Sequence, residues 1–106
     1  EVVDQGTPHF ASYVAAKGGQ NGLSRSLSKE LAPWNITVNM VSPGWIPVER
    51  HDAVSAEEKD AYFSTIPMGR WGAPSDVSGV VTFLASDSAS FVTGANIHVS
   101  GGRTVQ

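Results

Sequence analysis

The sequence contains no cysteine, so disulfide bonds and thiolate metal sites are excluded. It has no cluster of lysine or arginine and a formal net charge of −3, which argues against a nucleic-acid partner. No apolar run reaches the ~18 residues that a membrane span needs, and the N-terminal residues do not resemble a secretion signal. The three histidines lack ligand spacing, so we expect no metal site. The absence of cysteine suits a cytoplasmic protein.

The composition is that of a globular chain, with 41% hydrophobic and 16% charged residues. Its 106 residues suffice for one domain. The sequence begins at Glu1 rather than at methionine, with a loop-like stretch that Gly6 and Pro8 interrupt. We therefore expect a processed or truncated chain, or a piece of a longer protein.

Tyr13 and Lys17 stand at the start of a predicted helix over residues 13–32, with Ser12 as its N-cap. Side chains four residues apart share one helix face. A lysine cation beside a phenol favours the phenolate, so the pair is a candidate proton donor and acceptor. The same spacing also occurs on solvated helix faces, and the rest of the sequence must decide between the two interpretations.

The same helix carries a leucine stripe and three glycines. Leu23, Leu27 and Leu31 recur every fourth residue and predict a buried face. Glycines within a helix cost stability, which indicates that another backbone or a ligand comes close, or that the helix packs tightly against a neighbour. The glycines are Gly18, Gly19 and Gly22.

Two apolar segments predict strands. Residues 36–41 are β-branched and apolar, which favours a strand buried on both faces of a parallel sheet. Pro43 and Gly44 follow it, at the end of the strand where open α/β sheets bind ligands. A second strand is predicted over residues 95–99, after a helix that begins at Pro74. That helix carries an apolar stripe at Val77, Val80, Val81 and Leu84.

A long connection joins the first strand to the helix at Pro74. Ser55 and Glu58 have capping-box spacing and predict a short helix over residues 56–65. Connections of this length often form lids or substrate loops. The returning segment 66–74 is unusually apolar for a loop, so we expect it to pack against another part of the chain.

The order helix, strand, short helix, helix, strand predicts an α/β fold and a single partial domain over residues 1–106. A two-stranded sheet is marginal by itself. The strand at 36–41 requires a neighbour on each side, whereas the chain supplies one, by a crossover to residues 95–99. We therefore expect that part of a parallel sheet is missing.

Five motifs occur in order along the sequence: residues 13–17 (YVAAK), 36–44 (ITVNMVSPG), 67–77 (PMGRWGAPSDV), 83–87 (FLASD) and 91–94 (FVTG), with Gly101 and Gly102 at the end. Together they resemble the C-terminal part of the short-chain dehydrogenase/reductase family over about residues 12–102. The similarity is greatest to 3-oxoacyl-carrier-protein reductases and sugar or alcohol dehydrogenases. It implies the C-terminal portion of a Rossmann-like, doubly wound parallel sheet that lacks the N-terminal cofactor-binding half.

The resemblance implies catalytic roles for Tyr13 and Lys17. Tyr13 would donate a proton to a carbonyl oxygen or take one from an alcohol. Lys17 would hydrogen-bond the nicotinamide ribose and favour the phenolate of Tyr13. The reaction implied is hydride transfer between NAD or NADP and a small carbonyl or alcohol substrate.

The resemblance also implies a cofactor loop and a substrate loop. Pro43, Gly44 and Ile46 would lie beside the nicotinamide, with the Ile46 backbone near the carboxamide. Residues 45–66 would form the substrate loop, which would account for the long connection.

Several family features are absent from the sequence. The glycine-rich pyrophosphate turn, the residue that selects NAD or NADP, and the catalytic serine and asparagine all belong upstream; Ser12 and Asn39 do not match those positions. Val48 stands where a threonine often contacts the carboxamide, and Ser100 where an aspartate commonly precedes the two glycines. We therefore expect these 106 residues alone to bind no cofactor and to be inactive.

Three hypotheses follow from the sequence. The chain is a C-terminal fragment of an NAD(P)-dependent oxidoreductase, or a non-catalytic remnant, or a small binding module. A remnant would self-associate as a dimer or tetramer and bury its apolar stripes against copies of itself. A binding module would use residues 43–66 to hold an apolar ligand.

Overall fold

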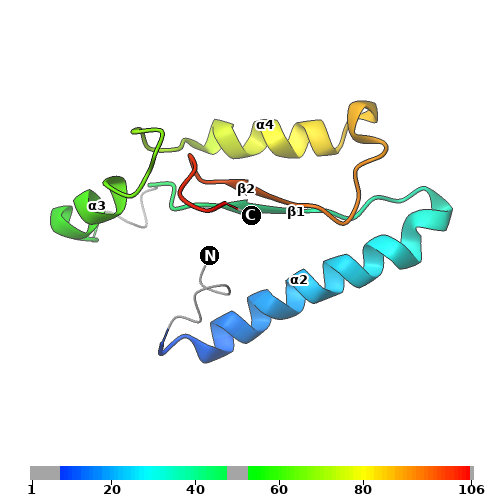
Figure 1. Ribbon diagram of the computed structural model, residues 1–106, viewed down its shortest axis with the longest axis horizontal. Coiled ribbons are helices and arrows are strands. Elements are labelled where there is room, and N and C mark those ends of the chain that lie inside the picture. Colours follow the sequence, from blue (N-terminus) through cyan, green and yellow to red (C-terminus); the bar gives the residue numbers. More distant parts are fainter. Residues whose placement is uncertain (1–7, 48–52, 106) are drawn as a thin grey trace. The chain divides into compact units, whose positions relative to one another are not determined.

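The computed structural model describes residues 8–47 and 53–105. Figure 1 shows the order of the elements along the chain. The chain divides into two compact units. The first contains α2, η1 and the segment Phe83–Ile97, and the second contains the segment Val41–Thr82 and the residues from His98 onward. The elements are α2 (Ala11–Leu31), η1 (Ala32–Trp34), β1 (Met40–Pro43), α3 (Ala56–Phe63), α4 (Pro74–Leu84), η3 (Asp87–Ala89) and β2 (Asn96–Val99).

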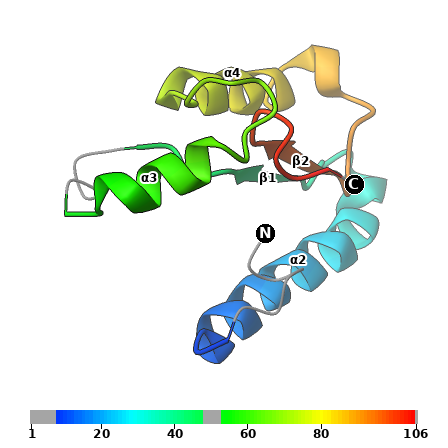
Figure 2. The ribbon, with the colours of Figure 1, turned by 60° about the vertical axis from the view of Figure 1, so that its left-hand side comes forward.

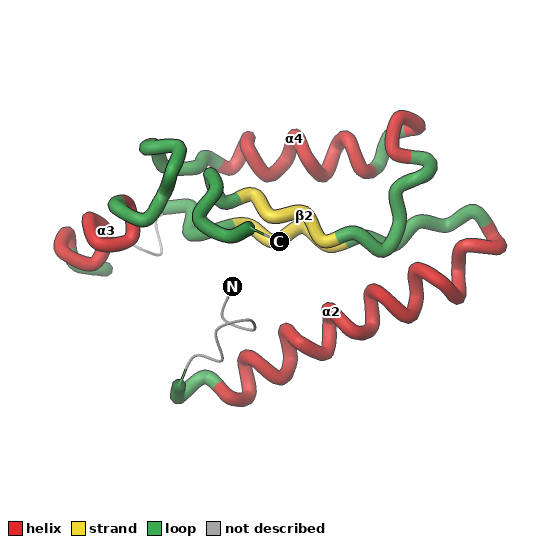
Figure 3. The backbone as a smooth tube through the Cα atoms, viewed as in Figure 1, coloured by secondary structure: helices red, strands yellow, loops and turns green. Residues whose placement is uncertain are grey.

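Strands β1 and β2 form a two-stranded parallel sheet (Figure 3). The Met40 N–H donates to the Ala95 carbonyl at 2.8 Å, and the Gly44 N–H donates to the Val99 carbonyl at 2.9 Å. Both bonds advance in the same direction along the two strands, as in a parallel ladder. The predicted crossover between the two strands is therefore confirmed, and β2 begins one residue later than predicted.

The prediction for the first strand was wrong in extent. β1 begins at Met40 rather than at residue 36, and Ile36 is 47% exposed. Strand pairing is the physical reason, because the ladder starts only where β2 runs alongside. With one neighbouring strand among the described residues, the side chains of β1 are half-buried or exposed rather than buried on both faces.

Helix α2 begins at Ala11, two residues before the predicted start, so Ser12 lies inside the helix and is not its N-cap. Phe10 occupies the N-cap position, and its carbonyl accepts the Val14 N–H at 2.8 Å. A backbone bond therefore closes the first turn without a side-chain cap. At the other end, Asn35 has a left-handed φ of 61° after the 3₁₀ turn η1 and ends the helical segment.

The stripe predicted to be buried on α2 is largely open in the described residues. Leu23 is 59% exposed, and Leu27 and Leu31 are half-buried. A Cβ atom on Gly19 or Gly22 would meet no described atom within 4 Å other than those of its chain neighbours and the adjacent helix backbone. The close approach that the helix glycines predicted is therefore not made at these two positions by any described residue.

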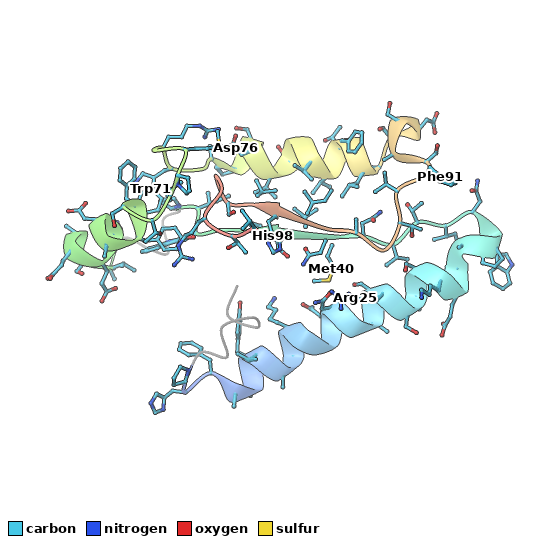
Figure 4. The ribbon with its side chains drawn as sticks, in the orientation of Figure 1. Arg25, Met40, Trp71, Asp76, Phe91 and His98 are labelled. Carbon is cyan, nitrogen blue, oxygen red and sulfur yellow. The ribbon has the colours of Figure 1, made fainter. Side chains whose placement is uncertain are left out.

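Asn39 connects the segment before β1 to the turn before β2. Its Nδ2 donates to the Val92 carbonyl at 2.9 Å, and its Oδ1 accepts the Ala95 N–H at 3.0 Å. The amide thus extends the ladder beyond the strands by making two bonds that a backbone would otherwise make. The side chain of the next residue, Met40, points toward Arg25 of α2 (Figure 4).

Helix α3 is capped as the sequence predicted. Ser55 is its N-cap, and the Ser55 Oγ accepts the Glu58 N–H at 3.1 Å. The helix ends at Phe63, two residues earlier than predicted. Helix α4 begins at Pro74, also as predicted, and runs beside the strand pair (Figure 2).

Asp76 closes the N-terminal turn of α4. Its carboxylate accepts the Ala73 N–H at 2.7 Å and two bonds from the Arg70 guanidinium at 3.0 and 3.1 Å. These bonds favour the charged form, so the Arg70 and Ala73 donors lower the pKa of Asp76 from its usual 3.8 to about 2.

We expect the contribution of Asp76 to stability to disappear in acid. The pKa is lower in the folded state, so the contribution is present above about pH 4 and is lost as the pH falls toward 2. Urea unfolding of the unmodified chain and of Asp76→Asn at pH 5 and at pH 2.5 measures this change. The free energies of unfolding of the two chains should differ more at pH 5 than at pH 2.5. An equal difference at both pH values would contradict the prediction.

Few apolar side chains are buried. Among the described residues, only Ile66 and Ala89 are buried apolar side chains, at 8% and 1% exposure. The stripe on α4 is half-buried except for Val81, which is 50% exposed. Large apolar side chains remain open at Phe10, Tyr13, Leu23, Trp34, Ile36, Phe63, Met68, Val81, Phe83, Phe91 and Val105. No helix in the described segments has the length and apolarity to cross a membrane.

Candidate active site

Tyr13 and Lys17 lie together on the N-terminal half of α2. The Lys17 Nζ is 5.5 Å from the centroid of the Tyr13 ring, and the Phe10 ring meets the same ring edge-on at 6.4 Å. The Tyr13 side chain is 50% exposed, and Lys17 is exposed as well. The phenol and the ammonium are therefore adjacent and open to an incoming molecule.

The predicted cofactor loop lies at the C-terminal end of β1, in the second unit. The Gly44 N–H is bonded to β2, and the Trp45 N–H donates to the Tyr62 hydroxyl at 2.8 Å. A Cβ atom on Gly44 would lie 3.0 Å from that hydroxyl and 3.3 Å from the Ser100 backbone. Glycine is needed here because the loop passes so close to its neighbours.

Ile46 and Pro43 complete the loop. Ile46 is half-buried and packs against Gly72, where an added Cβ would lie 3.5 Å from the Ile46 Cγ1. Pro43 is exposed. The predicted residues thus fall into two groups, the Tyr13–Lys17 pair in the first unit and the loop at 43–46 in the second.

An aromatic cluster that the sequence did not predict supports this loop. Trp45, Tyr62 and Trp71 have ring centroids 5.2 to 5.8 Å apart, with the Tyr62 and Trp71 rings parallel within 6°. Phe63 adds a fourth ring, 5.7 Å from Trp71. The expectation that the segment 66–74 packs against another part is confirmed for Trp71 and for Ile66, whereas Met68 is 65% exposed.

The role of Arg103 was also not predicted from the sequence. Its guanidinium lies 4.3 Å from the centroid of the Tyr62 ring, and its Nε donates to the Thr65 Oγ1 at 2.6 Å. The available signal was an arginine directly after the final two glycines. No local pattern connects it to an aromatic residue 41 positions earlier.

Some predicted features have no counterpart in the described structure. Val48, at the threonine position of the loop, lies outside the described residues, as does His51. Among the residues that the structure describes, no cluster of three acidic or histidine side chains could hold a metal ion. Asn39 has a structural role, because its side-chain amide bonds to the segment that precedes β2.

Comparison with known proteins gives the family. The family model described as enoyl-(acyl carrier protein) reductase matches residues 2–104. Among curated proteins, a 3-oxoacyl-(acyl-carrier-protein) reductase of Rickettsia felis is 46% identical over 97 residues, which cover 92% of this chain and 40% of the relative. The reductase of Staphylococcus aureus is 47% identical over 97 residues, with 92% and 39% covered.

A solved structure agrees with the sequence matches. It is a short-chain dehydrogenase/reductase from Brucella melitensis, described as a glucose/ribitol dehydrogenase. It superposes with a TM-score of 0.87 at 38% identity, over 99% of this chain and 42% of that one.

The chain spans about 40% of the length of the curated relatives it matches. Its parallel strand pair and its helices correspond to a part of the Rossmann-like α/β fold of that solved structure. The family match extends over nearly the whole sequence, including the Tyr13–Lys17 pair and the glycines at 44, 101 and 102. The chain therefore belongs to the short-chain dehydrogenase/reductase family.

Proposed function

We propose that Tyr13 and Lys17 supply the proton-transfer pair of an NAD(P)-dependent oxidoreductase, and that residues 43–46 supply its nicotinamide-facing loop. Its substrate would be a small carbonyl compound or alcohol. The observation that carries the proposal is the adjacency of the Tyr13 phenol and the Lys17 ammonium on one exposed helix face, with the Nζ 5.5 Å from the ring centroid. The similarity to 3-oxoacyl-(acyl-carrier-protein) reductases supports a carbonyl substrate.

Tyr13 acts as the acid in the reducing direction. Its phenol donates a proton to the substrate oxygen. The chemistry that a bound nicotinamide would supply is hydride transfer. The phenolate that remains lies beside the Lys17 ammonium, whose Nζ is 5.5 Å from the ring centroid. In the oxidising direction the same phenolate accepts the proton of the alcohol.

Each of the two units offers groups that suit a different part of a nicotinamide nucleotide. Lys17 has three N–H donors that suit ribose hydroxyls. The loop residues Pro43, Gly44 and Ile46 would lie beside the nicotinamide, with the Ile46 backbone near its carboxamide. The sequence has no glycine-rich turn to receive a pyrophosphate. We propose that residues 45–66 form the substrate loop of this partial domain, and that the 106 residues alone bind no cofactor and are inactive.

Activity measurements test the proposal. We expect the polypeptide encoded by the gene that carries these residues, called here the natural polypeptide, to oxidise NADH or NADPH with a carbonyl substrate. The 106-residue chain should show no turnover and no nicotinamide binding by fluorescence. A natural polypeptide that binds neither nicotinamide would overturn the proposal.

Self-association is a second candidate role, favoured by the apolar surface left open. Phe91 is fully exposed and Trp34 is 70% exposed, whereas only Ile66 and Ala89 are buried apolar side chains in the described segments. Burying such surface against copies of the chain would stabilise a dimer or tetramer. Sedimentation of the same 106-residue sample tests this, and a stable 11.2 kDa monomer at micromolar concentration would exclude it. Whether the chain acts as part of an oxidoreductase or as a self-associating protein, we propose that it is located in the cytoplasm.

A further inference from the structure

Tyr62 joins α3 to the loop after β1. Its hydroxyl accepts the Trp45 N–H at 2.8 Å and lies 3.0 Å from the position of a Cβ on Gly44. One oxygen on a helix side chain therefore holds the Trp45 backbone and lies close against the preceding loop residue, Gly44. A phenylalanine would keep the ring and lose this bond.

The Tyr62 ring is itself held by its neighbours. The Trp71 ring is stacked with it at 5.8 Å, and the Trp45 ring meets it edge-on at 5.2 Å, with the planes at 79°. The Arg103 guanidinium lies over the ring at 4.3 Å, within the range of a cation–π interaction. Figure 4 shows Trp71 beside α3, before the start of α4.

Arg103 is fixed by bonds at both its side chain and its backbone. Its Nε donates to the Thr65 Oγ1 at 2.6 Å, and that hydroxyl donates to the Tyr62 carbonyl at 2.6 Å. Its backbone N–H donates to the Ser100 carbonyl at 3.3 Å. The guanidinium therefore bridges the turn after β2 and the C-terminal end of α3.

We infer that Tyr62 and Arg103 are positioning residues. Tyr62 holds the Gly44–Trp45 backbone in place, and Arg103 holds Tyr62. The turn after β2 thereby sets the position of the loop after β1 through the substrate-loop helix. The inference rests on the proposed function for what the loop faces, namely the nicotinamide; the holding of the backbone is independent of it.

Hydrogen exchange of the Trp45 amide in the natural polypeptide tests the holding directly. Losing one hydrogen bond should accelerate its exchange on the order of five-fold in Tyr62→Phe. Arg103→Ala should accelerate it as well, and Arg103→Lys, which keeps the charge without the planar fork, should lie between. Phe63→Leu is the matched control, since Phe63 contacts Trp71 but not the Trp45 amide, and should leave the rate unchanged.

The double variant separates this mechanism from general packing. If Arg103 acts through Tyr62, adding Arg103→Ala to Tyr62→Phe should not accelerate the Trp45 amide further, whereas independent effects would multiply. Exchange of the α4 amides reports whether each variant is folded. Unchanged Trp45 exchange in Tyr62→Phe, or multiplied effects in the double variant, would overturn the inference.

Kinetics separate this inference from the proposed function. With the loop beside the nicotinamide, Tyr62→Phe should raise the cofactor KM several-fold and change kcat less. Faster Trp45 exchange with an unchanged cofactor KM would support the holding of the loop by Tyr62 and would overturn the cofactor role proposed for Gly44.

Discussion

Replacing Tyr13 by phenylalanine in the natural polypeptide is expected to lower kcat by about 10²–10⁴, the usual contribution of a positioned general acid. The variant removes one oxygen and keeps the ring that the Lys17 Nζ contacts at 5.5 Å. Because the proton transfer is made only in the transition state, kcat and kcat/KM should fall together while KM stays similar. Steady-state rates over a range of carbonyl substrate concentrations measure both quantities.

Ser12→Ala is the control for this experiment. Ser12 is exposed, adjacent to Tyr13 and inside α2 rather than at its cap. Its replacement should leave kcat and KM unchanged. A Tyr13→Phe variant with full kcat would show that the phenol takes no part in proton transfer, and Tyr13 and Lys17 would then be a solvated pair on the helix surface.

Gly101→Ala is expected to destabilise the folded state by about 2–5 kcal/mol, from left-handed backbone strain together with overpacking. Gly101 has a φ of +64°, and an added Cβ would lie 2.8 Å from the Ile66 Cγ2. Ile66 is only 8% exposed, so it has little room to move away. Urea unfolding monitored by circular dichroism gives the difference in free energy of unfolding.

Gly69 supplies a matched control, because it shares the backbone conformation without the contact. Its φ is +68°, and an added Cβ would meet no described atom within 4 Å other than those of its two chain neighbours. Gly69→Ala should therefore cost only the backbone term, about 1–2 kcal/mol. Equal destabilisation by the two substitutions would mean that Ile66 yields to the new methyl group without cost.

Local signals in the sequence predicted local structure well. The Ser55 hydroxyl caps α3, Pro74 begins α4, and β2 lies within the predicted 95–99 segment, because capping and strand composition act over a few neighbouring residues. The helix start at Ala11 was missed because the first turn closes on the Phe10 backbone and needs no capping side chain.

Burial and long-range contacts could not be predicted in the same way. The stripe through Leu23 identifies side chains that favour burial, but periodicity does not say whether a covering element is present in the same chain. For the candidate site, the Tyr13–Lys17 adjacency followed from helical spacing alone. The contact between Tyr62 and Arg103 depends on how a distant turn folds back, which no short sequence pattern encodes.

Asn39 has a consequence for how the sheet can be engineered or can misfold. Its side-chain amide hydrogen-bonds to two groups of the opposite segment, the Val92 carbonyl and the Ala95 N–H. Both bonds can form only while these two groups keep their present spacing. Shifting β2 by one residue would break both bonds and would also exchange the two faces of the strand. Asn39 thus fixes the register of the two strands, and inserting one residue between Val92 and Ala95 should disrupt their pairing.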